Sequence, residues 1–235
     1  MGNINTAEYW DNRFKTGDWE QRSGRTQTTS FAYEYVRLLQ IECNFTGTIL
    51  DFGCGLGDAI PVYKKHFPLA RFIGVDHSES GIGLCNEKYG AIAQFINGSV
   101  NAVPPVDVII ASNVFEHLTD DKQVACQLAE KCERLFIIVP YRQTIDEMQA
   151  GEHINSYHEQ SFDGIGIKVV RTKVFCSSAL AMKTRFRFMW YRIWQIWVKN
   201  IVRVMLNRKR GYTPREILFE IRGLDFAKKE EIDFA

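Results

Sequence analysis

The sequence lacks several features that would place the protein outside the cytoplasm. Its six cysteines include no C-x-x-C pair, which argues against a structural zinc site and against a disulfide framework. It contains no run of about 18 uncharged apolar residues, so no membrane-spanning helix is predicted. The first residues are polar and do not form the apolar core of a signal peptide. Together these absences favour a cytoplasmic protein.

Two common nucleotide-binding patterns are also missing. A dinucleotide-binding fingerprint, G-x-G-x-x-G, that began at Gly53 would need its third glycine at the position that Asp58 occupies. The Gly-Lys-Ser/Thr ending of a P-loop does not occur in the chain. These absences disfavour a nicotinamide cofactor and a nucleoside triphosphate, although an oxidoreductase on a similar fold stays open as an alternative.

One long segment has no acidic residues. Residues 164–215 contain 13 Lys or Arg and no Asp or Glu, whereas the rest of the chain contains 16 basic and 28 acidic residues. Within this segment, residues 182–210 interleave aromatic and basic side chains, and a helix is predicted over 178–206. Three interpretations are open: a helix packed on the core, a subsite for an anionic or lipid-linked molecule, and a contact with a membrane surface.

The most informative pattern that is present is a strand–turn–helix signature over residues 48–58, TILDFGCGLGD. Three glycines alternate in its turn, and the missing Cβ atoms let the backbone lie directly against a ligand. Asp51 and Asp58 stand on either side of the glycines. Their charges oppose a phosphate and favour a ligand that carries a cationic amine.

Short apolar strands that alternate with helices predict an α/β fold with a doubly wound, mostly parallel, seven-stranded sheet. The strands are expected over residues 49–52, 71–75, 94–96, 106–111, 135–139, 167–174 and 217–221. Helices are expected over residues 6–14, 27–42, 58–66, 79–89 and 120–132. We expect a single domain over 1–235, with an N-terminal helical lid over 1–44, a cofactor-binding core over 45–160 and a helical insertion over 177–211.

Four segments, in the expected order, resemble the motifs of the class I S-adenosylmethionine-dependent methyltransferases. They are DFGCGLGD at 51–58, FIGVDHS at 72–78, INGSV at 96–100 and VDVIIASNVFEHL at 106–118. The resemblance covers roughly residues 45–160. It implies a Rossmann-like methyltransferase fold and S-adenosylmethionine as the cofactor.

The resemblance also implies which residues surround the cofactor. Asp76 ends the second strand at the depth where a ribose lies, so its carboxylate is expected to accept from both hydroxyls. The turn after the third strand would flank the adenine, either through Ser99 or through its main chain. The expected cofactor-binding residues of the core are Asp51, Gly53, Cys54, Gly55, Asp58, Asp76, His77, Gly98, Ser99, Val100, Asn113 and Val114.

The segments 9–14 and 24–28 resemble the N-terminal lid of the same family. From them, Tyr9 and Gln27 are the residues expected to hold the methionyl carboxylate. The alternative for Tyr9 is that it belongs to an apolar helix face packed on the core.

Methyl transfer from a sulfonium leaves a neutral thioether, so the protein mainly supplies alignment and, for some acceptors, a base. The candidate bases are His117, after the fourth strand, and His153 and His158, after the fifth. Structural alternatives stay open for all three: cofactor packing for His117, and hydrogen bonds to the backbone for the other two.

A subset of the family binds a metal through two carboxylates and a histidine in the loop after the fourth strand. This chain has Glu116 and His117 there, but Asn113 stands in place of the first carboxylate. A hard divalent cation prefers more carboxylate ligands than that. No metal is therefore predicted.

The expected reaction is methyl transfer to an oxygen or nitrogen of a small acceptor. The basic segment suggests a phosphorylated, lipid-linked or nucleotide-linked sugar, as in glycan biosynthesis. The alternatives are a lipid or quinone methyltransferase at a membrane surface, reached through residues 182–210, and a binding module that retains only the cofactor pocket. Nucleic acid is not expected, because the chain lacks the proline-proline-aromatic motif of base-amino methyltransferases. The sequence leaves the oligomeric state undetermined.

Overall fold

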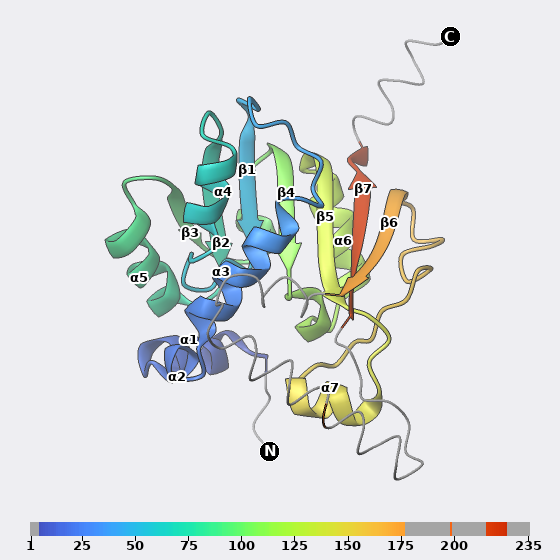
Figure 1. Cartoon of the computed structure of the whole chain (residues 1–235), viewed down its shortest axis with the longest axis horizontal. Coiled ribbons are helices and arrows are strands. Elements are labelled where there is room, and N and C mark those ends of the chain that lie inside the picture. The colour runs from blue at the N-terminus through green and yellow to red at the C-terminus, as the bar shows by residue number, and fades with distance from the viewer. Residues whose placement is uncertain (1–4, 177–197, 199–214, 225–235) are drawn as a thin grey trace.

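A computed structural model describes residues 5–176, Val198 and residues 215–224. Its described part contains a seven-stranded sheet in the order β3-β2-β1-β4-β5-β7-β6 (Figure 1). The strands are β1 (Thr48–Phe52), β2 (Arg71–Asp76), β3 (Gln94–Asn97), β4 (Val106–Ser112), β5 (Cys132–Pro140), β6 (Lys168–Cys176) and β7 (Arg215–Arg222). The first five are parallel, and β7 is antiparallel to both of its neighbours. The predicted mostly parallel, seven-stranded α/β sheet is confirmed.

The helices precede the sheet or connect its strands, as right-handed crossovers between parallel strands require. They are α1 (Ala7–Lys15), α2 (Asp18–Gln21), α3 (Gly24–Tyr35), α4 (Ile60–His66), α5 (Glu79–Tyr89), α6 (Asp121–Ala129) and α7 (Ile145–Gly151). Two short 3-10 turns, η1 (Val100–Ala102) and η2 (Phe115–His117), follow β3 and β4. None of the helices in the described part of the chain is long and apolar enough to cross a membrane.

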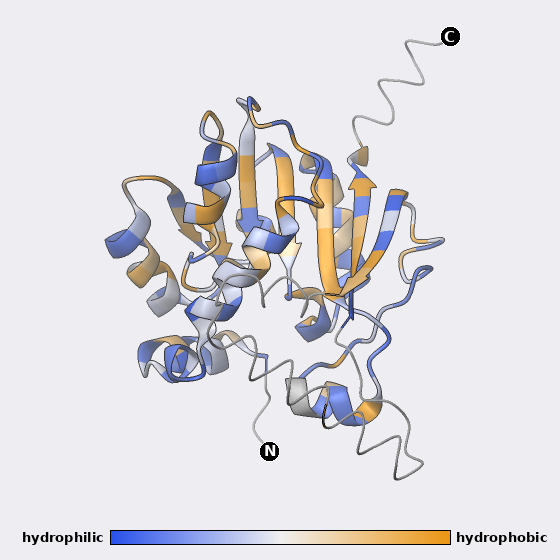
Figure 2. Ribbon diagram, viewed as in Figure 1, coloured by the Kyte–Doolittle hydropathy of each residue, from blue (hydrophilic) through white to orange (hydrophobic). Residues whose placement is uncertain are grey.

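Two apolar layers cover the sheet because side chains alternate along each strand. Along β4, Val108 and Ile110 pack in the layer that holds side chains of α3, α4 and α5. Ile109 and Ala111 pack in the other layer, with side chains of α6. Figure 2 shows the same result as continuous hydrophobic colour along the central strands. Burial on both faces explains why these strands read as unbroken apolar runs in the sequence.

Several boundaries differ from the prediction. The helix expected over 27–42 is α3, which ends at Tyr35. Just after the end of α3, the main-chain oxygens of Leu38 and Leu39 accept hydrogen bonds from the guanidinium groups of Arg171 and Arg134 in the sheet. The helix α7 was not predicted. Apart from Val198, the insertion expected over 177–211, and with it the membrane-contact segment 182–210, lies outside the described residues.

Glu220 of β7 links three strands and leads to a stability prediction. Its carboxylate pairs with Arg134 of β5 and with Arg171 of β6, each at 2.7 Å. Glu220→Gln should lower the free energy of unfolding by roughly 2 kcal/mol, because it leaves Arg134 and Arg171 without their carboxylate. These ion pairs are partly buried, so their loss should cost more than that of an exposed pair and less than that of a fully buried one. Urea denaturation measures this loss. The matched control is Glu159→Gln, whose solvent-exposed pair with Arg142 should contribute much less, so this variant should lose less stability than Glu220→Gln. Equal losses in the two variants would contradict the prediction.

Candidate functional site

A cavity of about 440 Å³ opens at the carboxyl ends of β1, β2 and β4. The strand order reverses between β1 and β4, and such switch points are where open α/β sheets bind ligands. The N-terminal helices α1 and α2 lie at this end of the sheet, as does α7 (Figure 1). The cavity volume is in the range of sites for small molecules and cofactors.

The glycine turn after β1 forms one wall of the cavity. The main-chain N–H groups of Gly53 and Cys54 both donate to the carbonyl oxygen of Val75, at 2.8 and 3.1 Å, which ties the turn to β2. Gly53 has a φ of 72°, and a Cβ atom there would lie 2.3 Å from a methyl carbon of Val114. Glycine is therefore required at this position both by backbone conformation and by space.

Asp76 lies beside this turn, at the end of β2, and is buried. One carboxylate oxygen accepts from the N–H of Gly55 at 2.8 Å, and the other accepts from the N–H of Ser78 at 2.9 Å. Burial raises the pKa of Asp76, and these two hydrogen bonds oppose the rise. Each oxygen keeps a lone pair with which to accept from a ligand hydroxyl. Ser78 itself caps α5 by accepting from the N–H of Gly81.

Asp51 lies at the base of the cavity and is 3% exposed. Burial raises the pKa of its carboxyl group to about 7, and the nearby charge of Asp76 adds to the rise. A cation placed in the cavity would favour the ionised form. Asp51 is therefore suited to binding a positively charged group of a ligand.

Asp58, the other acid of the glycine motif, is a correction to the prediction. It does not line the cavity and instead faces α5. Its carboxylate pairs with Lys88 at 2.7 Å and accepts from the hydroxyl of Tyr89 at 2.6 Å. Arg25 approaches the same oxygen at 3.4 Å. These three neighbours all contact Oδ1 and hold Asp58 against α5, whereas its buried Oδ2 has no hydrogen-bond partner among the described residues.

The N-terminal lid contributes different residues from those expected. Gln27 lines the cavity as predicted, but Tyr9 does not. The hydroxyl of Tyr9 bonds to the carboxylate of Glu152, which also pairs with the buried Arg13 at 3.3 Å. In its place, Trp10 lines the cavity from the same helix.

Phe14 also lines the cavity, one helical turn after Trp10. The spacing of these two aromatic residues in α1 is the signal that could have found them. A core-packing face was one of two interpretations left open for this helix; in the structure both residues line the cavity, and Phe14 is buried as well.

Three histidines were expected near the acceptor. His117, in η2, lines the cavity, and its ring is half-buried with its Nδ1 atom 3.2 Å from the main-chain oxygen of Glu152. His153 lies behind it, with 4.9 Å between the two ring centres. Burial lowers the pKa of both imidazoles, that of His117 to about 4. His158 is a correction, because it is exposed, lies outside the cavity lining and accepts a hydrogen bond from a loop N–H.

The turn after β4 rests on a buried polar network that the sequence analysis missed. Asn113, which lines the cavity with a φ of 54°, donates to the hydroxyl of Tyr35 at 3.0 Å. That hydroxyl donates to the buried carboxyl group of Glu216 at 2.8 Å. Burial raises the pKa of Glu216, and that of the nearby Glu116, to about 8. The network connects the last strand to the rim of the cavity.

Most of the predicted cofactor residues line one cavity. They are Gln27, Asp51, Gly53, Cys54, Gly55, Asp76, His77, Gly98, Ser99, Val100, Asn113 and Val114. Their contacts with a ligand remain predictions.

Comparison with known proteins agrees with this geometry. Residues 49–135 match the family model described as "Methyltransferase domain". Over these residues the chain matches a methyltransferase domain, as the motifs predicted, and the cofactor expected of such a domain is S-adenosylmethionine.

A curated relative matches part of the methyltransferase domain. It is trans-aconitate 2-methyltransferase from Afipia carboxidovorans, which is 34% identical over 89 residues. The match covers 35% of this chain and 34% of the relative. The chain thus spans about a third of the length of that relative.

Solved structures share the fold over most of the chain. One is a chain of the complex between the Haloferax volcanii Trm112 methyltransferase activator and a methyltransferase, with a TM-score of 0.63 and 14% identity, covering 91% of this chain and 97% of that one. Another is the plantazolicin methyltransferase BpumL in complex with S-adenosylhomocysteine, with a TM-score of 0.56 and 16% identity, covering 92% and 93%. At these identities the likeness establishes the fold alone.

Proposed function

We propose that this chain binds S-adenosylmethionine in the cavity and transfers its methyl group to an oxygen or nitrogen of a small acceptor. The observation that carries the proposal is the pairing of the glycine turn with Asp76 at the switch point of the sheet. The turn offers main-chain atoms without side chains in the way, and Asp76 offers two oriented acceptors. Asp51 adds the negative charge that a cationic amino acid favours.

The residues present fit the parts of this cofactor. Asp76 would accept from the ribose hydroxyls, and the turn from Gly98 to Val100 would flank the adenine. Asp51 and Gln27 would hold the methionyl group along the glycine turn. The cofactor supplies an already activated methyl group, so the protein's own contribution is alignment and exclusion of water.

The acceptor end of the cavity lies near η2. Because His117 is neutral at physiological pH, its free ring nitrogen presents a lone pair, not a charge, to an acceptor. The aromatic rings of Trp10 and Phe14 cover the cavity from α1 and would exclude water. His117 is therefore proposed to orient the acceptor, since a base with so low a pKa removes a proton weakly.

The proposed acceptor is a small anionic molecule, such as a phosphorylated, lipid-linked or nucleotide-linked sugar. What supports an anionic acceptor is the cationic segment 164–215, which contains no acidic residue of its own, although Arg171 within it pairs with Glu220. A lipid or quinone at a membrane surface would use the same charge and is the second candidate.

Calorimetry with S-adenosylhomocysteine and with NAD⁺ tests the cofactor. We expect saturable one-to-one binding of S-adenosylhomocysteine and none of NAD⁺; the reverse result would support an oxidoreductase. Transfer of a radiolabelled methyl group to sugar phosphates, nucleotide sugars, lipid-linked sugars in vesicles, quinones and trans-aconitate then tests the acceptor. Binding without transfer to any acceptor would favour a binding module.

The raised pKa of Asp51 predicts how cofactor affinity depends on pH. Above about pH 7 the carboxyl group is ionised in the free protein and attracts the cationic amine, whereas below pH 7 a proton must first leave. The dissociation constant of S-adenosylhomocysteine should therefore rise by up to about tenfold for each pH unit below 7. Calorimetry between about pH 8 and about pH 5.5 measures the slope. In Asp51→Asn the affinity should be lower and nearly independent of pH; an equally steep slope in this variant would assign the titration to another group.

A further inference from the structure

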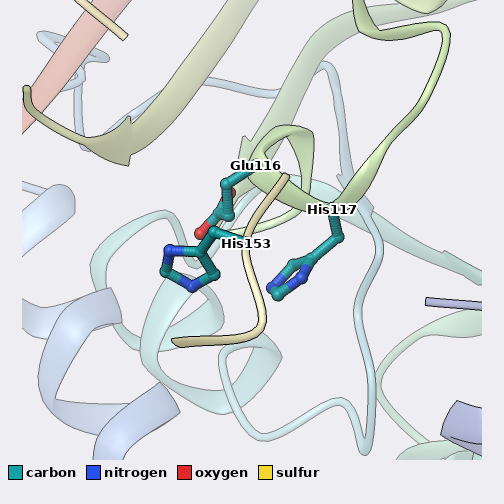
Figure 3. A group of neighbouring side chains, drawn as sticks. All are labelled: Glu116, His117 and His153. Carbon is teal, nitrogen blue, oxygen red and sulfur yellow. The ribbon is translucent and has the colours of Figure 1, made fainter. Parts of the chain in front are cut away.

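Glu116, His117 and His153 form a cluster at the rim of the cavity. One ligand atom from each lies within 4.8 Å of the others (Figure 3). Glu116 and His117 come from η2, and His153 comes from the loop after α7, so the fold brings together two separate segments. Only His117 of the three lines the cavity.

Both imidazoles are held in the same tautomeric state by their neighbours. The Nδ1–H of His117 donates to the main-chain oxygen of Glu152 at 3.2 Å, and that of His153 donates to the side-chain oxygen of Gln143 at 2.6 Å. Each Nε2 atom consequently carries a lone pair. Metal-binding histidines typically have this arrangement, with the second ring nitrogen donating to a carbonyl or carboxylate oxygen.

One oxygen of the carboxyl group in this cluster lacks a hydrogen-bond partner among the described residues. Glu116 is 1% exposed, and its Oε2 atom has no hydrogen-bond partner in the part of the chain that the structure describes. An unsatisfied buried carboxyl oxygen is costly unless a ligand or ion completes it. The burial of Glu116 beside two oriented imidazoles is thus an observation independent of their spacing.

Hydrogen bonds also hold the two loops together at this point. The N–H groups of Ile154 and Asn155 donate to the main-chain oxygen of Glu116 at 2.8 and 3.1 Å. The side-chain amide of Asn155 donates to the main-chain oxygens of Phe115 and Leu118. The nearby guanidinium group of Arg13 pairs with Asp18 at 3.1 Å and with Glu152, so its positive charge is balanced and should repel a cation in the cluster only weakly. The cluster is therefore held in position by the fold.

We propose that Glu116, His117 and His153 bind a divalent transition-metal ion of the zinc class, such as Zn²⁺ or Co²⁺. Two imidazoles and one carboxylate form a ligand set that suits borderline metals and leaves coordination positions open. The prediction of no metal considered only a hard divalent cation, for which Glu116 without a second carboxylate at Asn113 is a poor site. It did not include His153, which is distant in sequence. The nitrogen-rich set still disfavours Mg²⁺.

The ion would lie at the acceptor end of the cavity, beside His117. There the ion, in place of the His117 ring nitrogen, would hold an acceptor oxygen and lower the pKa of the acceptor group, a role that rests on the proposed function. The metal site itself does not depend on that function.

Cobalt titration of the untagged chain, without S-adenosylmethionine, tests the site. The exposed thiols of Cys43 and Cys176 are first replaced by Ser so that they do not bind the metal. We expect one Co²⁺ per chain, with visible ligand-field bands and no thiolate charge-transfer band, displaced by Zn²⁺ and not by Mg²⁺. His153→Gln and Glu116→Gln should each weaken Co²⁺ binding at least about tenfold. The matched control is His158→Gln, an exposed histidine of the same loop, which should leave the affinity unchanged.

Circular dichroism on each variant confirms that the fold persists. Absence of a saturable cobalt spectrum, or unchanged affinity in folded His153→Gln and Glu116→Gln, would overturn the metal site. Because the readout is a metal spectrum and not methyl transfer, such a result would leave the proposed function standing. Conversely, if the protein binds Co²⁺ but not S-adenosylhomocysteine, the metal site would be supported and the proposed function contradicted.

Discussion

Gly53→Ala is expected to abolish tight binding of S-adenosylhomocysteine and to lower the free energy of unfolding by about 3 kcal/mol. The new Cβ atom would lie 2.3 Å from a methyl carbon of Val114, and overpacking of this kind costs about 1–3 kcal/mol. The φ of 72° adds roughly 1–2 kcal/mol for a residue with a side chain. Relief of both strains moves the turn away from the position in which its backbone can lie against the cofactor. Calorimetry and urea denaturation measure the two effects.

The control for this variant is Gly83→Ala. Gly83 lies in α5, and a Cβ atom there would meet nothing within 4 Å. Alanine in a helix should stabilise the protein by about 0.5–1 kcal/mol and leave affinity unchanged. Adding Val114→Ala to Gly53→Ala should recover part of the stability, because it removes the clash and leaves the strained φ. Wild-type affinity in Gly53→Ala would show that the ligand does not lie on this turn.

Asp76→Ala is expected to weaken S-adenosylhomocysteine binding by roughly 2–4 kcal/mol, or about 30- to 900-fold. Two hydrogen bonds from the ribose would lose a charged acceptor. The N–H groups of Gly55 and Ser78 would lose their acceptor as well, which loosens the glycine turn. Calorimetry measures the affinity, and thermal melting separates it from any loss of stability.

Asp58→Asn is the matched control for Asp76→Ala. Both acids are buried and adjoin the glycine turn, but Asp58 faces Lys88 and not the cavity. It should change affinity by less than about threefold, while losing stability through its ion pair. Similar losses of affinity in the two variants would show that the carboxylate of Asp76 has no special relation to the ribose.

The sequence predicted the parallel core well because each of those strands is buried on both faces. Runs such as 106–111 are apolar without alternation, and glycines and acids mark the strand ends. Positions fixed by this chain order, such as Gly53 and Asp76, were consequently placed correctly at the cavity. The helix α7 was missed although it had a local signal: Thr144 and Glu147 form a capping box.

Other site residues depend on contacts between distant segments, which a single sequence does not reveal. The role of Asp58 is decided by Lys88, thirty positions later on a different helix. Tyr9 and Trp10 are neighbours in sequence, yet the docking of α1 turns one toward Glu152 and the other into the cavity. His153 joins His117 only because two loops cross at the rim. Periodicity fixes which face of an element is buried, but not which distant side chain it meets.

Glu152 joins three parts of the rim through a single residue. Its carboxylate accepts hydrogen bonds from Tyr9 and Arg13 of α1. Its main-chain oxygen accepts hydrogen bonds from the side-chain amide of Asn5 and from the imidazole of His117. An outward movement of α1 would break the bonds from Tyr9 and Arg13, and Glu152 would then keep only its main-chain bonds, among them that to His117, and whatever support its own loop gives. The orientation of the His117 ring therefore depends in part on a residue that the first helix holds in place.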